Sequence, residues 1–179
     1  IFFDLDHTLW DFDKNSMLAF KRVFKKFKII IEFDAFLKIY EPINVEYWKK
    51  YREDKVSKEN LRRGRLIDSF NFFDLIYTTE KIDEIADAYI QELPFDNHLF
   101  EGALEILDYL ILKYKLHIIT NGFEEVQHKK LKNSGIDCYF STVTTSEEVG
   151  LKKPNPKVFL TALNKANSLP AQSVMIGDS

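Results

Sequence analysis

The sequence predicts an α/β fold, in which helices pack on a parallel β-sheet and an all-helical segment is inserted after the first strand. Short apolar runs alternate with amphipathic helical patterns from residue 96 onward, which is typical of βαβ units. Another apolar run opens the chain at residues 1–5. Residues between these regions show helical periodicity and no convincing strand. We therefore predict a sheet domain of residues 1–12 and 96–179 and a helical domain of residues 13–95.

The composition is that of a globular protein with a substantial core. Of the 179 residues, 45% are hydrophobic, with 16 Phe and 8 Tyr among them, so disorder is not expected. The net charge of −3 gives no indication of nucleic-acid or membrane binding. A single cysteine, Cys138, excludes an internal disulfide and is predicted to be buried.

Several features of the chain favour a cytoplasmic location. No apolar run reaches the length of about 20 residues that a membrane span needs, and no secretory leader is evident. The sequence opens inside an apolar run without Met and stops directly after another strand-like run. We therefore expect the natural chain to continue beyond both ends.

Four helices are expected in the inserted segment. Apolar residues recur at helical spacing over residues 17–27, and residues 33–51 form an aromatic-rich helix that Pro42 should end or kink. Ser57 and Thr79 are expected to cap the third and fourth helices. The apolar stripes predict the core of a helical bundle rather than a cofactor site.

Charge is distributed unevenly along the chain. Residues 13–95 hold 16 Lys and Arg against 15 Asp and Glu, whereas the remainder holds 9 against 13. The inserted segment also contains all five arginines: Arg22, Arg52, Arg62, Arg63 and Arg65. They could supply guanidinium groups to an anionic substrate, or they could simply solvate helix faces. The basic helix near Lys14–Lys28 carries its aromatic residues on the apolar side, so we do not expect nucleic-acid binding.

The rest of the chain alternates between strands and helices. The expected order is a helix over 101–114, a strand over 116–120, a helix over 123–133 that stops near Gly135, a strand over 142–145, a helix over 156–166 and a strand over 173–176.

Polar residues follow the predicted strands. Asp4 and Asp6 follow the first strand, Thr120-Asn121-Gly122 ends the second, Lys152-Lys153 precedes the last helix, and Asp178 follows the last strand. Each has an ordinary explanation on its own, as a turn residue, a helix cap or a solvated charge. Because ligands bind outside the carboxyl ends of strands in such sheets, we expect these residues to gather at one edge.

As a group, these residues offer what phosphoryl transfer through an aspartyl-phosphate requires. The acids provide a carboxylate nucleophile and hard oxygen ligands for Mg²⁺. A hydroxyl group, backbone N–H groups and a lysine provide donors for the phosphoryl oxygens.

Four segments, DLDHT, TNG, KKPNP and IGDS, occur in the order of the four motifs of the haloacid dehalogenase-like (HAD) hydrolase superfamily, which the chain resembles over its whole length. The resemblance implies a Rossmann-like parallel-sheet core with an inserted all-helical C1 cap domain. It also implies a Mg²⁺-dependent phosphate monoester hydrolase.

The resemblance further implies roles for individual residues. Asp4 is the nucleophile, and Asp6 protonates the leaving oxygen and later activates water. Thr120 holds a phosphoryl oxygen, and Lys153 neutralises charge, with Lys152 as its neighbouring alternative.

Further roles concern the metal and the substrate. Mg²⁺ is expected on the Asp4 carboxylate, the Asp6 backbone carbonyl and Asp178, while Thr8, Asn121 and Gly122 are expected to support substrate binding. The superfamily usually has a second acid a few residues beyond Gly177-Asp178, which lies outside this sequence.

Alternative functions remain open at this point. Dehalogenases of the superfamily lack the second acid at the Asp6 position, so its presence favours a phosphatase, whereas phosphomutases share all four motifs. A catalytically silent binding module would commonly have lost Asp4, Asp6 or Lys153.

The segments TNGFEEVQHKKLKNSGIDCYF and SEEVGLKKPNP are similar to a bacterial branch of pyrimidine 5'-nucleotidases, which makes a nucleoside monophosphate the leading substrate candidate. Phosphoglycolate and sugar phosphates remain alternatives, because substrate choice depends on the cap. We expect a monomer or a homodimer.

Overall fold

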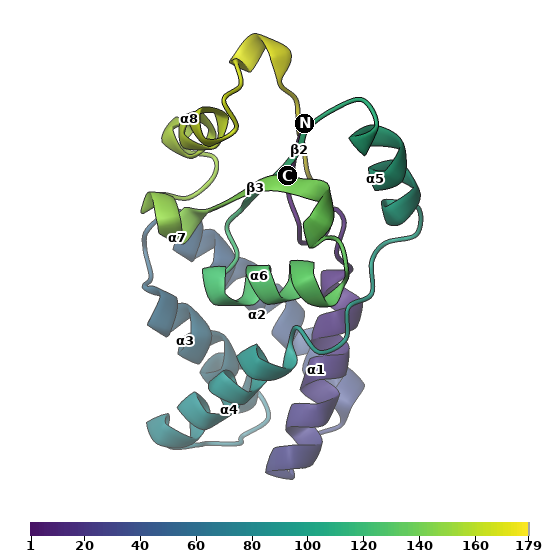
Figure 1. The fold of residues 1–179 in the computed structure, drawn as a ribbon. Helices are drawn as coiled ribbons and strands as arrows, with labels where there is room; N and C mark the ends of the chain where they lie inside the picture. The colour runs from purple at the N-terminus through teal and green to yellow at the C-terminus, as the bar shows by residue number, and fades with distance from the viewer. Residues whose placement is uncertain (179) are drawn as a thin grey trace. The chain divides into compact units, whose positions relative to one another are not determined.

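The computed structural model describes residues 1–178, and the chain folds into two compact units (Figure 1). The sheet unit contains Ile1–Ser16 and Pro94–Ser179, and the helical unit contains Met17–Leu93. That each unit is a separate folding domain stays a prediction. No helix within the described part of the chain is long and apolar enough to span a membrane.

A four-stranded parallel sheet forms the centre of the sheet unit. Its order is β3-β2-β1-β4, and every neighbouring pair is parallel. The strands are β1 (Phe2–Phe3), β2 (Leu116–Thr120), β3 (Phe140–Thr145) and β4 (Met175–Ile176). All five residues of β2 are buried, as expected for an inner strand that is covered on both faces. The predicted α/β fold with a parallel sheet is confirmed.

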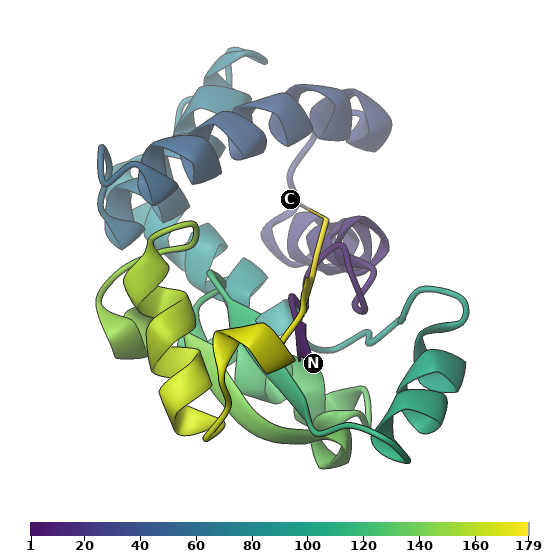
Figure 2. The ribbon, with the colours of Figure 1, turned by 90° about the horizontal axis from the view of Figure 1, so that it is seen from above.

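Helices cover both faces of this sheet. They are α5 (Ala103–Ile111), α6 (Glu124–Asn133), α7 (Ser146–Val149) and α8 (Pro156–Lys165). Helices α5 and α8 lie on opposite sides of the sheet (Figures 1 and 2). Val158 and Ala162 of α8 pack on Phe2 and Ile119, so this face of the sheet forms an apolar core.

Two of these helices differ from the sequence-based expectation. Helix α5 is shorter than predicted at both ends and starts after Gly102, whose φ of 80° is a conformation that favours glycine. Helix α7 was not predicted, because its four residues are too few to show a helical period.

The helical unit contains the predicted four helices and, among its described residues, no strand. They are α1 (Phe12–Phe27), α2 (Phe33–Arg52), α3 (Lys58–Asn71) and α4 (Thr79–Glu92). Aromatic rings form much of the core, with centroid distances of 4.1 Å for Phe20–Tyr89, 5.3 Å for Phe20–Phe36 and 5.6 Å for Phe36–Phe70. The bundle core expected from the apolar stripes is confirmed.

The first turn of α1 belongs to the sheet unit. Asn15 is fully buried there, and its Nδ2 donates to the backbone oxygens of Asp11 (2.8 Å) and His98 (2.9 Å). The backbone N–H of His98 donates in return to Asn15 Oδ1 at 2.9 Å. The buried Asn15 side chain therefore holds together, by hydrogen bonds, the two chain segments that lead into and out of the helical unit.

Helix α2 covers the predicted residues 33–51, and Pro42 does not end it, because buried side chains on both sides of the proline hold the helix in the bundle: Phe36, Tyr40, Asn44 and Tyr51. The expected kink at Pro42 stays a prediction. Cys138 is exposed rather than buried, because it lies in the 3₁₀ turn Asp137–Tyr139 at the surface.

Most arginines have partners inside the helical unit. The partners are Glu92 for Arg22, Asp87 for Arg62, Asp83 for Arg63 and the Asn44 side chain for Arg65. These contacts favour a structural role for the four arginines over a role in binding an anionic substrate.

The N-terminal cap of α4 is Thr78 rather than the predicted Thr79. Thr78 Oγ1 accepts a hydrogen bond from the Lys81 backbone N–H at 3.3 Å. We expect Thr78→Ala to lower the free energy of unfolding by about 1 kcal/mol, because it removes this cap. Urea denaturation measures the loss. Thr79→Ala, the matched control, should cost less than half as much, and equal losses would contradict the assignment.

Candidate active site

Three strand ends meet at one edge of the sheet. Asp4 follows β1, Thr120 ends β2, and Asp178 follows β4. The strands are parallel, and the Asp4 backbone N–H donates to Ile176 O at 2.8 Å. This hydrogen bond sets Asp4 beside the segment that carries Asp178.

The Asp4 carboxylate is held by two donors. Its Oδ2 lies 2.6 Å from Lys153 Nζ, and its Oδ1 accepts a hydrogen bond from the Leu5 backbone N–H at 2.8 Å. Burial raises the pKa of Asp4 above its ordinary value; the Lys153 ammonium opposes this rise, and Asp6 adds to it. Both side chains of the ion pair are only 14% exposed, and Lys153 is the group that most opposes the rise in the pKa of Asp4.

Asn121 fixes the backbone of Lys153. Asn121 Oδ1 accepts from the Lys153 N–H at 2.8 Å, and Asn121 Nδ2 donates to Lys153 O at 3.1 Å. These two hydrogen bonds clamp the loop before α8 onto the end of β2. The Asn121 side chain thus positions Lys153, and its proposed contact with substrate stays a prediction.

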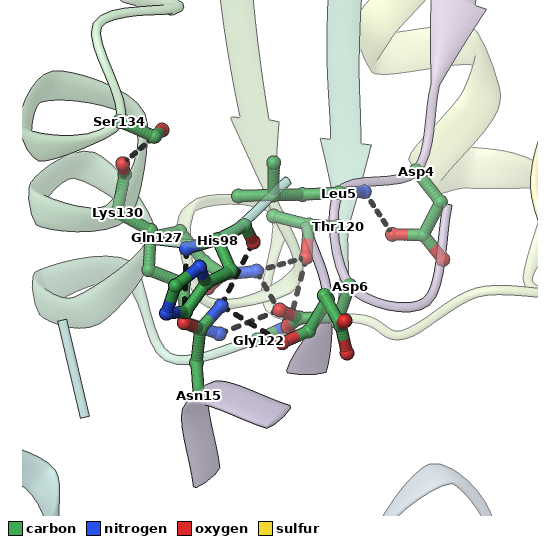
Figure 3. Close-up of polar contacts among 11 residues, drawn as sticks. Asp4, Leu5, Asp6, Asn15, His98, Thr120, Gly122, Gln127, Lys130 and Ser134 are labelled. Carbon is green, nitrogen blue, oxygen red and sulfur yellow. Dashed lines mark hydrogen bonds and ion pairs between the residues drawn. The ribbon is translucent and has the colours of Figure 1, made fainter. Parts of the chain in front are cut away.

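Asp6 is held by two side chains of helix α6 (Figure 3). Lys130 Nζ lies 2.6 Å from Asp6 Oδ1, and Gln127 Nε2 donates to Asp6 Oδ2 at 3.0 Å. Lys130 is only 2% exposed, and its Nζ lies 4.1 Å from the centroid of the Trp10 ring. Burial lowers the pKa of Lys130, and the Asp6 carboxylate opposes that shift.

Thr120 lies beside this group. Its Oγ1 accepts hydrogen bonds from Gln127 Nε2 at 2.7 Å and from the Gly122 backbone N–H at 3.1 Å. The Gly122 N–H is therefore engaged within the protein, although the sequence suggested that it would face an anion. Its assignment to substrate binding stays a prediction.

Two other predicted residues lie apart from these contacts. The buried Thr8 hydroxyl group forms no hydrogen bond within residues 1–178. Asp178 is exposed and follows β4 without a regular structure of its own. The structure thus brings Asp4 to Lys153 and Asp6 to Thr120, while the roles of Thr8 and Asp178 stay predictions.

Sequence reasoning missed Gln127 and Lys130. Phe123, Gln127 and Lys130 follow one another at i, i+4 and i+7, and all three are buried. Two polar residues on the apolar stripe of a helix are a signal that could have indicated a buried polar partner.

The donor atoms at this edge suit a hard divalent cation. Asp4 and Asp178 offer carboxylate oxygens, and the Asp6 backbone oxygen accepts no hydrogen bond within residues 1–178. No group of three or more His, Cys, Asp or Glu side chains in that range is arranged to hold a metal. The predicted ligand set contains two such side chains and one backbone carbonyl, so it suits Mg²⁺ by the type of its donor atoms, and the metal site itself stays a prediction.

A parallel sheet with paired carboxylates and a lysine at its carboxyl edge defines an α/β protein with a candidate active site at that edge. A family model described as haloacid dehalogenase-like hydrolase matches the chain over residues 1–179. The chain belongs to that family, which confirms the resemblance of its four motifs.

Two similar relatives are pyrimidine 5'-nucleotidases. YjjG of Escherichia coli (strain K12) is 31% identical over 180 residues, which cover 100% of this chain and 76% of YjjG. PynA of Streptococcus pneumoniae is 32% identical over 183 residues, which cover 100% of this chain and 75% of PynA.

A solved structure supports the fold. The magnesium-bound crystal structure of YfnB from Bacillus subtilis aligns with a TM-score of 0.87 and 26% identity, covering 99% of this chain and 78% of YfnB.

Proposed function

We propose that this protein hydrolyses phosphate monoesters through a phosphorylated Asp4, and that nucleoside 5'-monophosphates are its substrates. The observation that carries the proposal is the Asp4–Lys153 pair of 2.6 Å at the carboxyl edge of the sheet, where Thr120 ends the neighbouring strand β2. This edge is where ligands bind in open parallel sheets.

The reaction has two steps. An Asp4 carboxylate oxygen attacks phosphorus and the bond to the ester oxygen breaks, while Asp6, which must be protonated for this step, gives its proton to the leaving alkoxide. Water then attacks the aspartyl-phosphate, Asp6 takes a proton from that water, and inorganic phosphate leaves with Asp4 regenerated. The Lys153 ammonium and the Thr120 hydroxyl group stabilise the phosphoryl oxygens during both transfers.

Asp4, Asp178 and the Asp6 backbone carbonyl would hold Mg²⁺, which neutralises phosphoryl charge when bound. The oxygen-only donor set supports this assignment. The magnesium in the YfnB crystal structure supports it as well.

The substrate class rests on the relatives. Two pyrimidine 5'-nucleotidases match the chain over its full length at 31% and 32% identity. Substrate choice in such enzymes depends on groups that contact the leaving alcohol, so the phosphatase chemistry is proposed independently of the nucleotide.

The test is phosphate release from a panel of nucleoside monophosphates, sugar phosphates and phosphoglycolate. We expect turnover that needs added Mg²⁺ and disappears on chelation with EDTA, because phosphoryl charge would then be uncompensated. Preference for dUMP, dTMP or UMP supports the nucleotidase assignment. Preference for a sugar phosphate or phosphoglycolate overturns only the substrate class, and no turnover with Mg²⁺ present overturns the proposed function.

A further inference from the structure

Helix α6 directs two polar side chains into the interior beside the proposed catalytic groups. Gln127 is fully buried, and Lys130 is 2% exposed. They lie three residues apart and therefore share one face of the helix. Burying an amide and an ammonium group is costly unless both find partners, so their contacts are expected to be specific.

Gln127 bridges two residues that the proposed reaction uses, Thr120 for a phosphoryl oxygen and Asp6 for the leaving oxygen. Its Nε2 donates to Thr120 Oγ1 at 2.7 Å and to Asp6 Oδ2 at 3.0 Å (Figure 3). The opposite amide orientation would set Oε1 against the Asp6 carboxylate, two acceptors in contact, so the assigned orientation is favoured. One amide group thus spans the phosphate-binding and the proton-transfer residues.

This bridge determines what the Thr120 hydroxyl group can do. Thr120 Oγ1 already accepts from Gln127 and from the Gly122 N–H at 3.1 Å. A hydroxyl oxygen has two acceptor lone pairs and one hydrogen, so both acceptor positions are taken. The Thr120 hydroxyl group can therefore still donate its one hydrogen, and a phosphoryl oxygen, which is an acceptor, needs such a donor.

Lys130 completes the arrangement by holding the other oxygen of Asp6. Its ammonium lies 2.6 Å from Asp6 Oδ1 and is covered by the Trp10 and Phe12 rings, with centroids at 4.1 Å and 5.2 Å. Both oxygens of the Asp6 carboxyl group are therefore held by one helix, which restricts rotation of the side chain.

Glycine at position 122 makes the bridge possible. A Cβ atom on Gly122 would lie 2.4 Å from Cδ and Nε2 of Gln127. A larger residue at position 122 would therefore displace the Gln127 amide from Thr120 and Asp6, while the amide group itself stays unchanged.

We propose that Gln127 and Lys130 are positioning residues, which fix the Thr120 hydroxyl group as a hydrogen-bond donor and hold the Asp6 carboxyl group in place for proton transfer. This inference deepens the proposed function and rests on it. A buried polar cluster that only stabilises the fold would show the same contacts, so the test needs a readout of the reaction itself.

The first readout is the dependence on the leaving group. The value of kcat/KM covers only the steps up to release of the alcohol, so slow hydrolysis of phospho-Asp4 does not affect it. We expect Lys130→Met to lower kcat/KM for a nucleoside monophosphate on the order of 10²-fold, as expected for a displaced catalytic group. Its effect on p-nitrophenyl phosphate, whose leaving group needs no proton, should be several-fold smaller. Lys130→Arg, which keeps the charge, should recover most of the loss.

The second readout is a double-mutant cycle between Gln127→Met and Thr120→Val. If Gln127 acts through Thr120, its substitution should cost much less in the Thr120→Val background than in the wild type. Gly122→Ala gives a second route to the same displacement and should resemble Gln127→Met. This variant keeps the test valid if Gln127→Met fails to fold.

Matched controls come from the exposed face of the same helix. His128→Met and Lys129→Met lie next to the two tested positions and should leave kcat/KM within about twofold of the wild type, as is usual for surface sites. Equal losses for both substrates with Lys130→Met, or independent effects in the cycle, would overturn the inference while leaving the proposed function intact. A wild type that turns over no monoester overturns the proposed function instead.

Discussion

Asp4→Asn is expected to abolish phosphate release, with a loss of at least about 10⁴-fold in kcat, as for removal of other covalent nucleophiles. An amide nitrogen or oxygen cannot replace the carboxylate that forms the acyl-phosphate bond. The amide oxygen can still accept the Leu5 N–H that Asp4 Oδ1 accepts at 2.8 Å, so the fold should be retained. Steady-state phosphate release measures the loss, and acid quenching should trap protein-bound phosphate in the wild type alone.

The matched control for this variant is Asp13→Asn. Asp13 is an exposed acid in the first turn of α1, and its side chain is 75% exposed. This substitution should leave turnover unchanged. Residual activity of Asp4→Asn within tenfold of the wild type, with both proteins folded, would remove Asp4 from the role of nucleophile.

Asp6→Ala is expected to lower the free energy of unfolding by about 3 kcal/mol or more, an effect that does not depend on the proposed reaction. The substitution leaves the Lys130 ammonium group buried without its carboxylate, and breaking a buried ion pair in this way costs about 3–5 kcal/mol. The contacts of Lys130 with the Trp10 and Phe12 rings compensate only part of that cost. Urea denaturation of the wild type and the variant measures the difference.

The double variant Asp6→Ala with Lys130→Met tests the cause. Methionine is similar to lysine in length and carries no charge, so the double variant should be more stable than Asp6→Ala alone by about 2 kcal/mol. Additive losses from the two substitutions would show that the ion pair is not what makes Asp6→Ala costly. Lys129→Met, on the exposed face of α6, should not improve the stability of Asp6→Ala.

Much of the fold could be predicted because its signals are local. Strand β2 covers Leu116–Thr120 as predicted, since five consecutive apolar or β-compatible residues are bounded by a turn. Ser57 caps α3 as predicted, and its Oγ accepts from the Asn60 N–H at 3.1 Å. Both features depend on residues within one turn or one strand, so neighbouring residues are sufficient to define them.

Predictions were less accurate where local sequence allows two solutions. Thr78 and Thr79 are both suitable N-caps for α4. Thr78 has the extended backbone of an N-cap residue, with φ of −67° and ψ of 160°, and its side chain caps the helix. Helix α2 passes through Pro42 because its packing outweighs the loss of one backbone hydrogen bond. For α2, the energy that decides the structure therefore comes from contacts of the buried side chains with the rest of the bundle.

The residues of the candidate site also differ in how far the sequence could predict them. The order of the four motifs and their positions near strand ends predicted Asp4, Asp6, Thr120 and Lys153 as site residues, because parallel strands bring their carboxyl ends to one edge. The family resemblance favoured Lys153, the residue before proline, over its neighbour Lys152 as the lysine that faces Asp4. The structure shows the ammonium of Lys153 at 2.6 Å.

Periodicity and short ordered motifs are sufficient to predict the parallel α/β fold with its helical insertion, the family, and the strand ends that carry the candidate site residues. The contacts of Gln127 and Lys130 with Asp6 could not be predicted in this way. These residues are separated from Asp6 by 121 and 124 positions, and their burial shows only when α6 packs beside β2. Ion pairs and hydrogen bonds between distant segments depend on side-chain distances, and these distances are defined only when the chain is packed.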